Sequence, residues 1–254
     1  MNKIATAAAV ALALTGLSSV ARAATLSADF FDVPAGGPNT DTYSAPSPSN
    51  PTGDFGVCCS SPNATLPVIA PGSPLGPDGL PVTTLAASSG GVIAQNGAGE
   101  ILWWSAAFAN PTGHGAFTLG QLNNMFAPNS TGSNDNYLYE TAILSGTLTG
   151  HGNPASITVA SDDDALVYVG GVYVGGLPGV HPTEYTTINL GSFTGPKTLD
   201  IFFADRAQVG ANLEVSVSGA SVPEPAAWAT MLLGLGALGG AMRQLRRRPS
   251  PAKA

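Results

Sequence analysis

Short runs of β-branched and aromatic residues, separated by glycine, asparagine, proline or aspartate, fill most of the chain after residue 91. These runs lack the period of an amphipathic helix, and strands at this spacing are typical of antiparallel sandwiches and barrels. With residues 26–33 as a first strand, the pattern predicts an all-β, antiparallel β-sandwich of jelly-roll-like form. The other expected strands are 92–94, 100–108, 116–119, 137–149, 156–160, 165–174, 185–190, 198–204 and 212–218.

Two stretches interrupt this pattern. Residues 34–81 contain 11 of the 21 prolines. Proline cannot donate to a sheet ladder, so we expect a long irregular excursion there with short edge strands such as 65–69. An excursion of this length is either functional or a spacer. Residues 121–126 are expected to form a single helical turn.

The N-terminus has the organisation of a secretory signal peptide. Lys3 provides a positive charge, residues 4–17 form a hydrophobic run, and Ala21-Arg22-Ala23 is a small-x-small cleavage site. This order favours cleavage between Ala23 and Ala24 over the alternative of a buried N-terminal helix. Residues 1–23 are therefore set apart from the fold.

The C-terminus combines three features in sequence. Val222-Pro223-Glu224-Pro225 precedes an uncharged run at 226–242, and four arginines follow between residues 243 and 248. The run is at the short limit for a helix that crosses a bilayer core of roughly 30 Å. The arginines favour a cytoplasmic location for the extreme C-terminus, which predicts that residues 24–222 lie outside the cytoplasm.

This tail, residues 221–254, resembles the PEP-CTERM sorting signal of exported bacterial proteins. The residues that carry the resemblance are Pro223, Glu224 and Pro225, the run 226–242 and the arginine cluster. The resemblance implies recognition by a membrane exosortase and cleavage near the Pro-Glu-Pro. The protein would be anchored transiently and then reach the cell surface or extracellular matrix of a Gram-negative-type bacterium. A permanent single-span anchor is the alternative.

The predicted ectodomain is strongly acidic. It contains 15 of the 16 acidic residues but only two basic ones, Lys197 and Arg206, for a net charge of −13. Such a surface repels nucleic acid and anionic lipid, so no nucleic-acid partner is expected. It suits metal cations and neutral partners, although acidity alone also keeps an extracellular domain soluble.

The two cysteines are adjacent. Cys58 and Cys59 cannot link distant segments, and a ring between neighbours is strained because a bridge needs Cα atoms about 4.4–6.8 Å apart. An intermolecular bridge and free thiols are the alternatives. No His or Cys partner lies at metal-ligand spacing.

Three consecutive carboxylates, Asp162, Asp163 and Asp164, lie between two hydrophobic runs. Such a cluster repels itself unless a cation or hydrogen-bond donors compensate it. Ca²⁺ binds carboxylate, amide and backbone carbonyl oxygens, and the ectodomain has few basic residues. From the residues alone, a bound Ca²⁺ and a solvated acidic turn both remain open.

The predicted domain, residues 24–220, contains the motifs Ala28-Asp-Phe-Phe-Asp32, Ser161-Asp162-Asp163-Asp164, Gly179-Val180-His181, Phe202-Phe-Ala-Asp-Arg206 and Gly210-Ala-Asn-Leu213. In these motifs it resembles the protective-antigen-type (PA-fourteen-like) carbohydrate-binding β-sandwich, and most closely its fibro-slime branch. The chain departs from the family pattern at Gly170 and Asp205, which bears on sugar specificity.

The resemblance implies that Asp162 and Asp163 hold a Ca²⁺ ion that contacts sugar hydroxyls. Asn212 and backbone carbonyls would complete the shell, and Asp164 would either add a ligand or face solvent. His181 is expected to support the Asp loop rather than to bind a ligand. Arg206 is expected to pair with a carboxylate.

Adjacent side chains in a strand point to opposite faces. One of Trp103 and Trp104 is therefore expected in the core, and the other either stacks on a sugar or makes a second buried contact.

An enzyme is not expected. No nucleophile elbow, phosphate-binding loop or His-Glu-x-x-His motif occurs, and the adjacent aspartates do not form the separated carboxylate pair of a glycosidase. The sequence predicts an exported, Ca²⁺-dependent module that binds a glycan or exopolysaccharide. The alternative is a structural matrix or surface protein that binds no sugar.

Overall fold

The structure is a computed structural model that describes residues 24–33, 55, 67–84, 93–124, 139–207 and 211–222. The secondary structure of those residues comprises β1 (Thr25–Val33), η2 (Leu102–Trp104), β2 (Asn110–Thr118), β3 (Asn123–Asn124), β4 (Tyr139–Asp162), β5 (Asp164–Val169), β6 (Val172–Leu177), β7 (Glu184–Ala204), β8 (Asn212–Ser218) and β9 (Ala220–Ser221). All pairings between these strands are antiparallel, which confirms the predicted fold class.

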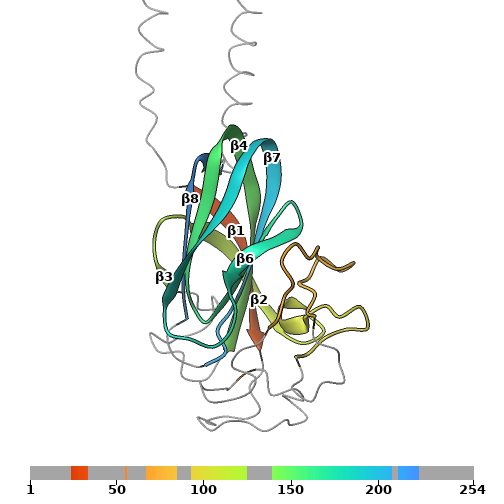
Figure 1. Ribbon diagram of the computed structural model, residues 1–254. Coiled ribbons are helices and arrows are strands. Elements are labelled where there is room, and N and C mark those ends of the chain that lie inside the picture. The colour runs from red at the N-terminus through yellow and green to blue at the C-terminus, as the bar shows by residue number, and fades with distance from the viewer. Residues whose placement is uncertain are drawn as a thin grey trace, which may run out of the picture.

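Two long strands, β4 and β7, run through both layers of the sandwich (Figure 1). The N-terminal part of β4, 139–150, pairs with the C-terminal part of β7, 195–204. Together they lie at the centre of one layer of order β2-β1-β4-β7-β5-β6. The C-terminal part of β4, 154–162, pairs with the N-terminal part of β7, 184–192, and β8 pairs with β4 on its other side. These three segments form the second layer. β3 continues this second layer beyond β8.

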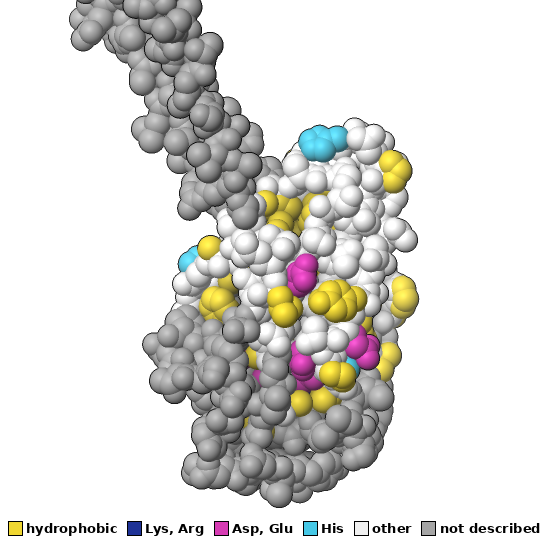
Figure 2. All heavy atoms as spheres, turned by 90° about the vertical axis from the view of Figure 1, so that its left-hand side faces the viewer, with side chains coloured by type: hydrophobic (Ala, Val, Ile, Leu, Met, Phe, Trp, Pro, Cys, Tyr) yellow, Lys and Arg dark blue, Asp and Glu magenta, His cyan; other side chains and the backbone are white. Residues whose placement is uncertain are grey.

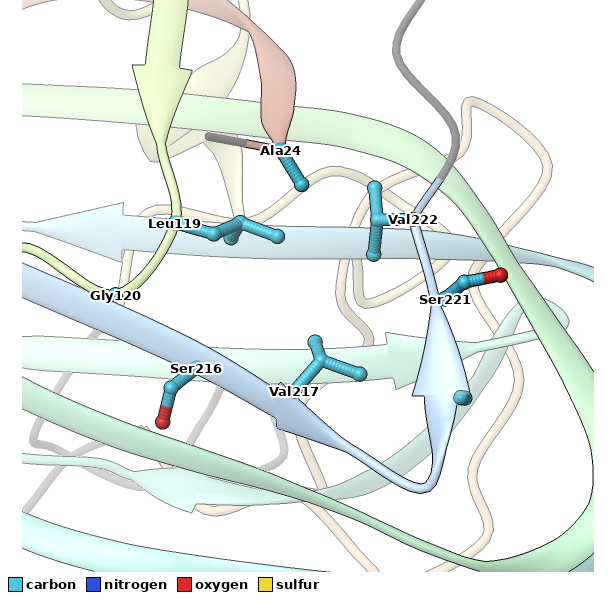
Figure 3. A pocket seen from close by; sticks show the side chains of 8 residues that line it. Ala24, Leu119, Gly120, Ser216, Val217, Ser221 and Val222 are labelled. Atoms are coloured by element: carbon cyan, nitrogen blue, oxygen red, sulfur yellow. The ribbon is translucent and has the colours of Figure 1, made fainter. Parts of the chain in front are cut away.

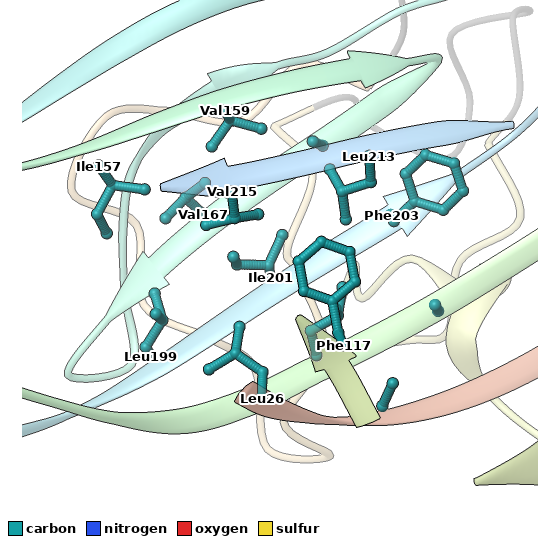
Figure 4. Close-up of a cluster of buried hydrophobic side chains, with 14 of the residues drawn as sticks. Leu26, Phe117, Ile157, Val159, Val167, Leu199, Ile201, Phe203, Leu213 and Val215 are labelled. Atoms are coloured by element: carbon teal, nitrogen blue, oxygen red, sulfur yellow. The ribbon is translucent and has the colours of Figure 1, made fainter. Parts of the chain in front are cut away.

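The space between the two layers is filled by a hydrophobic cluster that we call the inner core (Figure 4). Because side chains alternate along a strand, every second residue of β5 points into it. Ala165, Val167 and Val169 belong to the inner core, together with Leu144 on β4 and Ile201 on β7. Each of these side chains is almost completely removed from water, and this burial of apolar surface favours the folded state.

The first layer is also buried on its other face. Leu166 and Tyr168, which alternate with the inner-core residues of β5, belong to a second cluster, the outer core. The outer core is covered by segments 67–84 and 93–109, which lie to one side of the strands in Figure 1. The described part of the proline-rich excursion, including Phe55, is therefore a packed layer on the sheet.

Trp103 and Trp104 lie in η2, within the run 100–108 that was expected to be a strand, so that prediction is wrong. Both rings are buried in the outer core, 5.4 Å apart between centroids. The 3-10 turn lets adjacent rings enter one cluster, which a strand would prevent. The second expected alternative, a second buried contact, is therefore the one that the structure shows for these rings.

Several other boundaries differ from expectation. The expected strands 137–149 and 156–160 form one strand, β4, and the expected strands 185–190 and 198–204 form β7. The expected strand 165–174 is divided into β5 and β6 by Gly170 and Gly171, both with positive φ. The described part of the expected helical turn at 121–126 contains no helix and includes strand β3 at Asn123–Asn124.

The first and last described residues lie together at one corner of the sandwich (Figure 3). Ala24 and Val222 line the same small cavity of about 380 Å³, and Leu119 lines it too. The backbone N–H of Leu119 donates to the Ala24 carbonyl, and the N–H of the next residue, Gly120, donates to the carbonyl of Val215 on β8. The described members of both hydrophobic clusters lie within residues 24–222. Because both clusters, as far as the structure describes them, lie in this segment, we expect residues 24–222 to fold and use them in the experiments below.

No helix among the described residues has the length and apolar character needed to cross a membrane. The expected signal peptide, Cys58 and Cys59, and the expected transmembrane run 226–242 fall outside the ranges given above.

Candidate functional site

The three aspartates form a connection between β4 and β5, which we call the Asp loop. β4 ends at Asp162, β5 begins at Asp164, and the peptide bond between Asp162 and Asp163 is cis. Asp162 lies directly opposite Asn212, the first residue of β8. The structure thus brings together two of the residues that the sequence placed in one site, although they are far apart in the chain.

Asp164 is completely buried and forms an ion pair. Its Oδ2 accepts a hydrogen bond from Arg206 Nε at 2.7 Å, and both side chains have zero exposure. Its Oδ1 accepts a hydrogen bond from the backbone N–H of Gly179. Burial raises the pKa of the Asp164 carboxyl, and the Arg206 charge opposes that shift. The expectation that Asp164 could face solvent is wrong, and both of its oxygens are already engaged.

Asp164 is the carboxylate that the sequence analysis expected beside Arg206 but did not name. The Arg206 guanidinium lies 4.9 Å from the centre of the Trp103 ring, in addition to its ion pair with Asp164. The prediction that Arg206 pairs with a carboxylate is confirmed. The pair joins the start of β5 to the second residue beyond β7, so it fixes one side of the Asp loop against the outer core.

Asp163 is held by backbone groups. Its Oδ1 accepts the N–H of His181 at 3.0 Å and its Oδ2 accepts the N–H of Arg206 at 2.9 Å. Burial and the neighbouring Asp164 charge raise the pKa of Asp163 to about 7. A carboxylate oxygen can accept more than one bond, so these contacts orient Asp163 without exhausting its acceptor capacity.

His181 contributes its backbone to the loop. Its ring Nδ1 lies 2.9 Å from the carbonyl oxygen of Pro182, and its backbone N–H binds Asp163. The backbone of His181 therefore supports the Asp loop, whereas the role of its ring stays a prediction.

Asp162 is the half-buried member of the loop and lies at its open side. Its Oδ2 accepts a hydrogen bond from Thr183 Oγ1 at 3.3 Å. Burial raises the pKa of the Asp162 carboxyl, while Thr183 and the nearby His181 oppose the shift. In the described part of the chain, no Lys or Arg forms an ion pair with Asp162.

The oxygens of the loop suit a hard cation better than a soft one. Asp162 and Asp163 supply carboxylates and Asn212 supplies an amide oxygen, which are the ligand types that Ca²⁺ accepts. Among the described residues, no group of three His, Cys, Asp or Glu side chains could hold a metal. A complete shell would therefore need Asn212 and backbone carbonyls. Asp164 does not fit as a ligand, because Arg206 already balances its charge.

Sequence reasoning missed two residues beside the loop. Thr183 holds Asp162, and Tyr185 is 66% exposed on β7, opposite Ala160 of β4. Ala160 and Asp162 share one face of β4, since they are two residues apart. An aromatic residue that begins an expected strand at 185–190 is the signal that could have identified Tyr185.

The Asp loop lies at the end of the second layer that is remote from Ala24 and Val222. β8 runs from Asn212, opposite the loop, to Ser218, near that corner, a distance of about 20 Å for a strand of this length. Figure 2 shows Asp and Glu side chains on one face of the molecule, with no Lys or Arg among the described atoms in view.

Comparison with protein families identifies the C-terminal tail. A family described as the PEP-CTERM protein-sorting motif matches residues 221–248. The chain therefore carries a PEP-CTERM sorting motif, which confirms that part of the sequence prediction. The motif implies export and surface association in bacteria. No curated protein sequence matches the chain.

Solved structures with detectable similarity are remote. The chain is 13% identical to the "PA14 sugar-binding domain from RTX adhesin", with 80% of this chain and 94% of that chain covered and a TM-score of 0.34. It is 15% identical to the PA14 domain of the MpAFP antifreeze protein, over 34% of this chain and 49% of that chain, with a TM-score of 0.28.

A third similarity is to β-glucosidase from Kluyveromyces marxianus. The identity is 10% and the TM-score 0.33, over 43% of this chain and 14% of the enzyme. The chain thus spans about half of the antifreeze domain and about one-seventh of the enzyme. Similarities this remote do not assign a function.

Proposed function

We propose that this protein is an exported surface module that binds a glycan through Ca²⁺ held at the Asp loop. The observation that carries the proposal is the pairing of Asp162 with Asn212 at the open side of the loop. Asp164 is balanced internally by Arg206, whereas Asp162 has no such partner among the described residues. The tail adds a direct reason to expect the module at a cell surface.

Each residue has a distinct part in this proposal. Asp162 and Asp163 would hold the cation with their carboxylates, and Asn212 would add its amide oxygen. Bound Ca²⁺ would supply coordination positions for sugar hydroxyls. The backbone N–H groups of His181 and Arg206 orient Asp163 before any ligand arrives. Preorganisation of this kind reduces the entropy lost on binding.

The test is a calcium titration of residues 24–222 by calorimetry, with a thermal melt alongside. We expect saturable binding and a higher melting temperature in Ca²⁺. Asp162→Asn removes the loop's uncompensated charge and should weaken Ca²⁺ binding about tenfold or more, since charge count strongly tunes such sites. Asp29→Asn is the matched control, because Asp29 is an exposed acid on β1 that pairs with His114.

Equal Ca²⁺ binding by wild type and Asp162→Asn would refute the metal site. If the site binds Ca²⁺, the loaded domain is then screened on a glycan array that includes bacterial exopolysaccharides. Binding that disappears in EDTA supports the proposal. Absence of any glycan signal would favour the alternative of a structural matrix protein, in which the Asp loop serves only to pin the ends of β4 and β5.

A further inference from the structure

A second cavity lies away from the Asp loop, between the covering layer and the outer face of the sheet. It has a volume of about 480 Å³ and we call it the outer cleft. β4 and β7 form its sheet side, through Ser145, Asp200 and Phe202, and the covering layer closes it with Leu75, Asp78 and Trp104. Binding pockets for small molecules typically measure roughly 300–1,000 Å³.

The polar groups on the sheet side are organised as a pair. Ser145 and Asp200 are cross-strand partners, and Ser145 Oγ donates a hydrogen bond to Asp200 Oδ1 at 2.9 Å. This contact leaves the other carboxylate oxygen of Asp200 available to a ligand. Ile143 lies two residues before Ser145 on the same face of β4, is partly exposed, and gives the cleft an apolar surface beside the carboxylate.

The opposite side of the cleft presents a second carboxylate. The backbone N–H of Asp78 binds the buried Glu100 Oε1 at 2.8 Å, which fixes the loop that carries Asp78. The Asp78 side chain itself is exposed and accepts a hydrogen bond from Asn96 Nδ2 at 3.3 Å. Two acceptor groups from segments far apart in the sequence therefore face one cavity.

The lining indicates the chemical class of the ligand. Anions are disfavoured, because two carboxylates and no Lys or Arg line the cleft. A metal alone is disfavoured, because the lining of the cleft offers two carboxylates, Asp78 and Asp200, and no His, Cys or amide side chain to complete a shell. A neutral ligand with several hydroxyl donors and an apolar ring face satisfies both the carboxylates and the apolar surface. Neutral saccharides have this combination of groups.

We propose that the outer cleft is a second, metal-independent binding site for a neutral saccharide, with Asp200 and Asp78 as hydrogen-bond acceptors and Ser145 positioning Asp200. The site is distinct from the Asp loop. Along β7, Asp200 precedes Ala204, the cross-strand partner of Asp164, by four residues, or about 13 Å. A domain with two separate saccharide sites could link neighbouring polysaccharide chains.

The test uses saturation-transfer NMR on residues 24–222 with methyl glycosides of glucose, galactose and mannose as probes, in EDTA. We expect transfer to at least one probe in wild type and in Asp162→Asn. Asp200→Ala should weaken binding about ten- to hundredfold, the effect of losing a hydrogen bond to a charged group. Asp78→Ala should also weaken it, and Asp78 is exposed, so this variant should retain its fold.

Glu214→Ala serves as the control, because Glu214 is a β8 carboxylate that does not line the cleft. Absence of transfer to every probe in EDTA would overturn the proposal, as would unchanged binding in both Asp200→Ala and Asp78→Ala. Binding that requires Ca²⁺ and is lost in Asp162→Asn would place the saccharide at the Asp loop alone. The two proposals therefore fail separately.

Discussion

Replacing Arg206 with methionine tests whether the buried ion pair holds the Asp loop in place. Methionine keeps much of the packing volume but leaves Asp164 as a buried carboxylate without its cation. Breaking one partner of a buried pair costs about 3–5 kcal/mol. For a domain of this size, each kcal/mol lowers the melting temperature by about 2–4 °C, so the expected loss is about 6–20 °C.

The assay is urea unfolding and thermal melting of residues 24–222, with Lys197→Met as the control. Lys197 is exposed and lies 5.1 Å from the centre of the Phe193 ring, so its loss should cost no more than about 1 kcal/mol. The double variant Asp164→Leu/Arg206→Met removes both charges and should be more stable than Arg206→Met. A loss below about 1 kcal/mol in Arg206→Met would refute the argument.

Two further predictions concern the turns and the outer cleft. Gly219 and Gly191 both have positive φ, but an added Cβ would contact the Pro154 carbonyl only at Gly219. Gly219→Ala should therefore cost about 2–5 kcal/mol in urea unfolding against about 1–2 for Gly191→Ala, and equal losses would contradict this. Burial raises the pKa of Asp200, so the folded state favours the protonated carboxyl. The free energy of unfolding is therefore unaffected by ionisation of this group below about pH 4 and decreases as the pH rises through the folded pKa. Because asparagine does not ionise, Asp200→Asn should become more stable relative to wild type as the pH increases over this range, in urea unfolding. A stability difference that does not change with pH would refute the raised pKa of Asp200.

The sandwich could be predicted because its strands alternate so regularly. In the expected strand 137–149, Ile143 and Ser145 share a face, as they do in β4. The covering segments 67–84 and 93–109 lie on that face. Sequence periodicity cannot reveal that both faces are buried when a proline-rich segment supplies the cover. It also cannot show that β4 and β7 continue through a bend, since glycine and proline at that point indicate a break between strands.

The candidate site was predictable in its members more than in their roles. The resemblance placed Asp162, Asp163 and Asn212 together, and the register of β4 and β8 brings Asp162 opposite Asn212. The role of Asp164 depends on Arg206, which lies on another strand connection and reaches the carboxylate only after folding. The outer cleft has no sequence signal, because its carboxylates come from segments that meet only in the tertiary structure.

Ala24 and Val222 lie at one corner, so a tether at either end would orient the domain in the same way relative to the surface that carries it. A linkage at either terminus holds the molecule by the same point, so the Asp loop faces away from the supporting surface in both cases. Immobilisation of the domain by either end on a sensor should therefore expose the same binding surface. In a cell envelope, the same geometry would direct that surface toward the surroundings before and after any release of the tail.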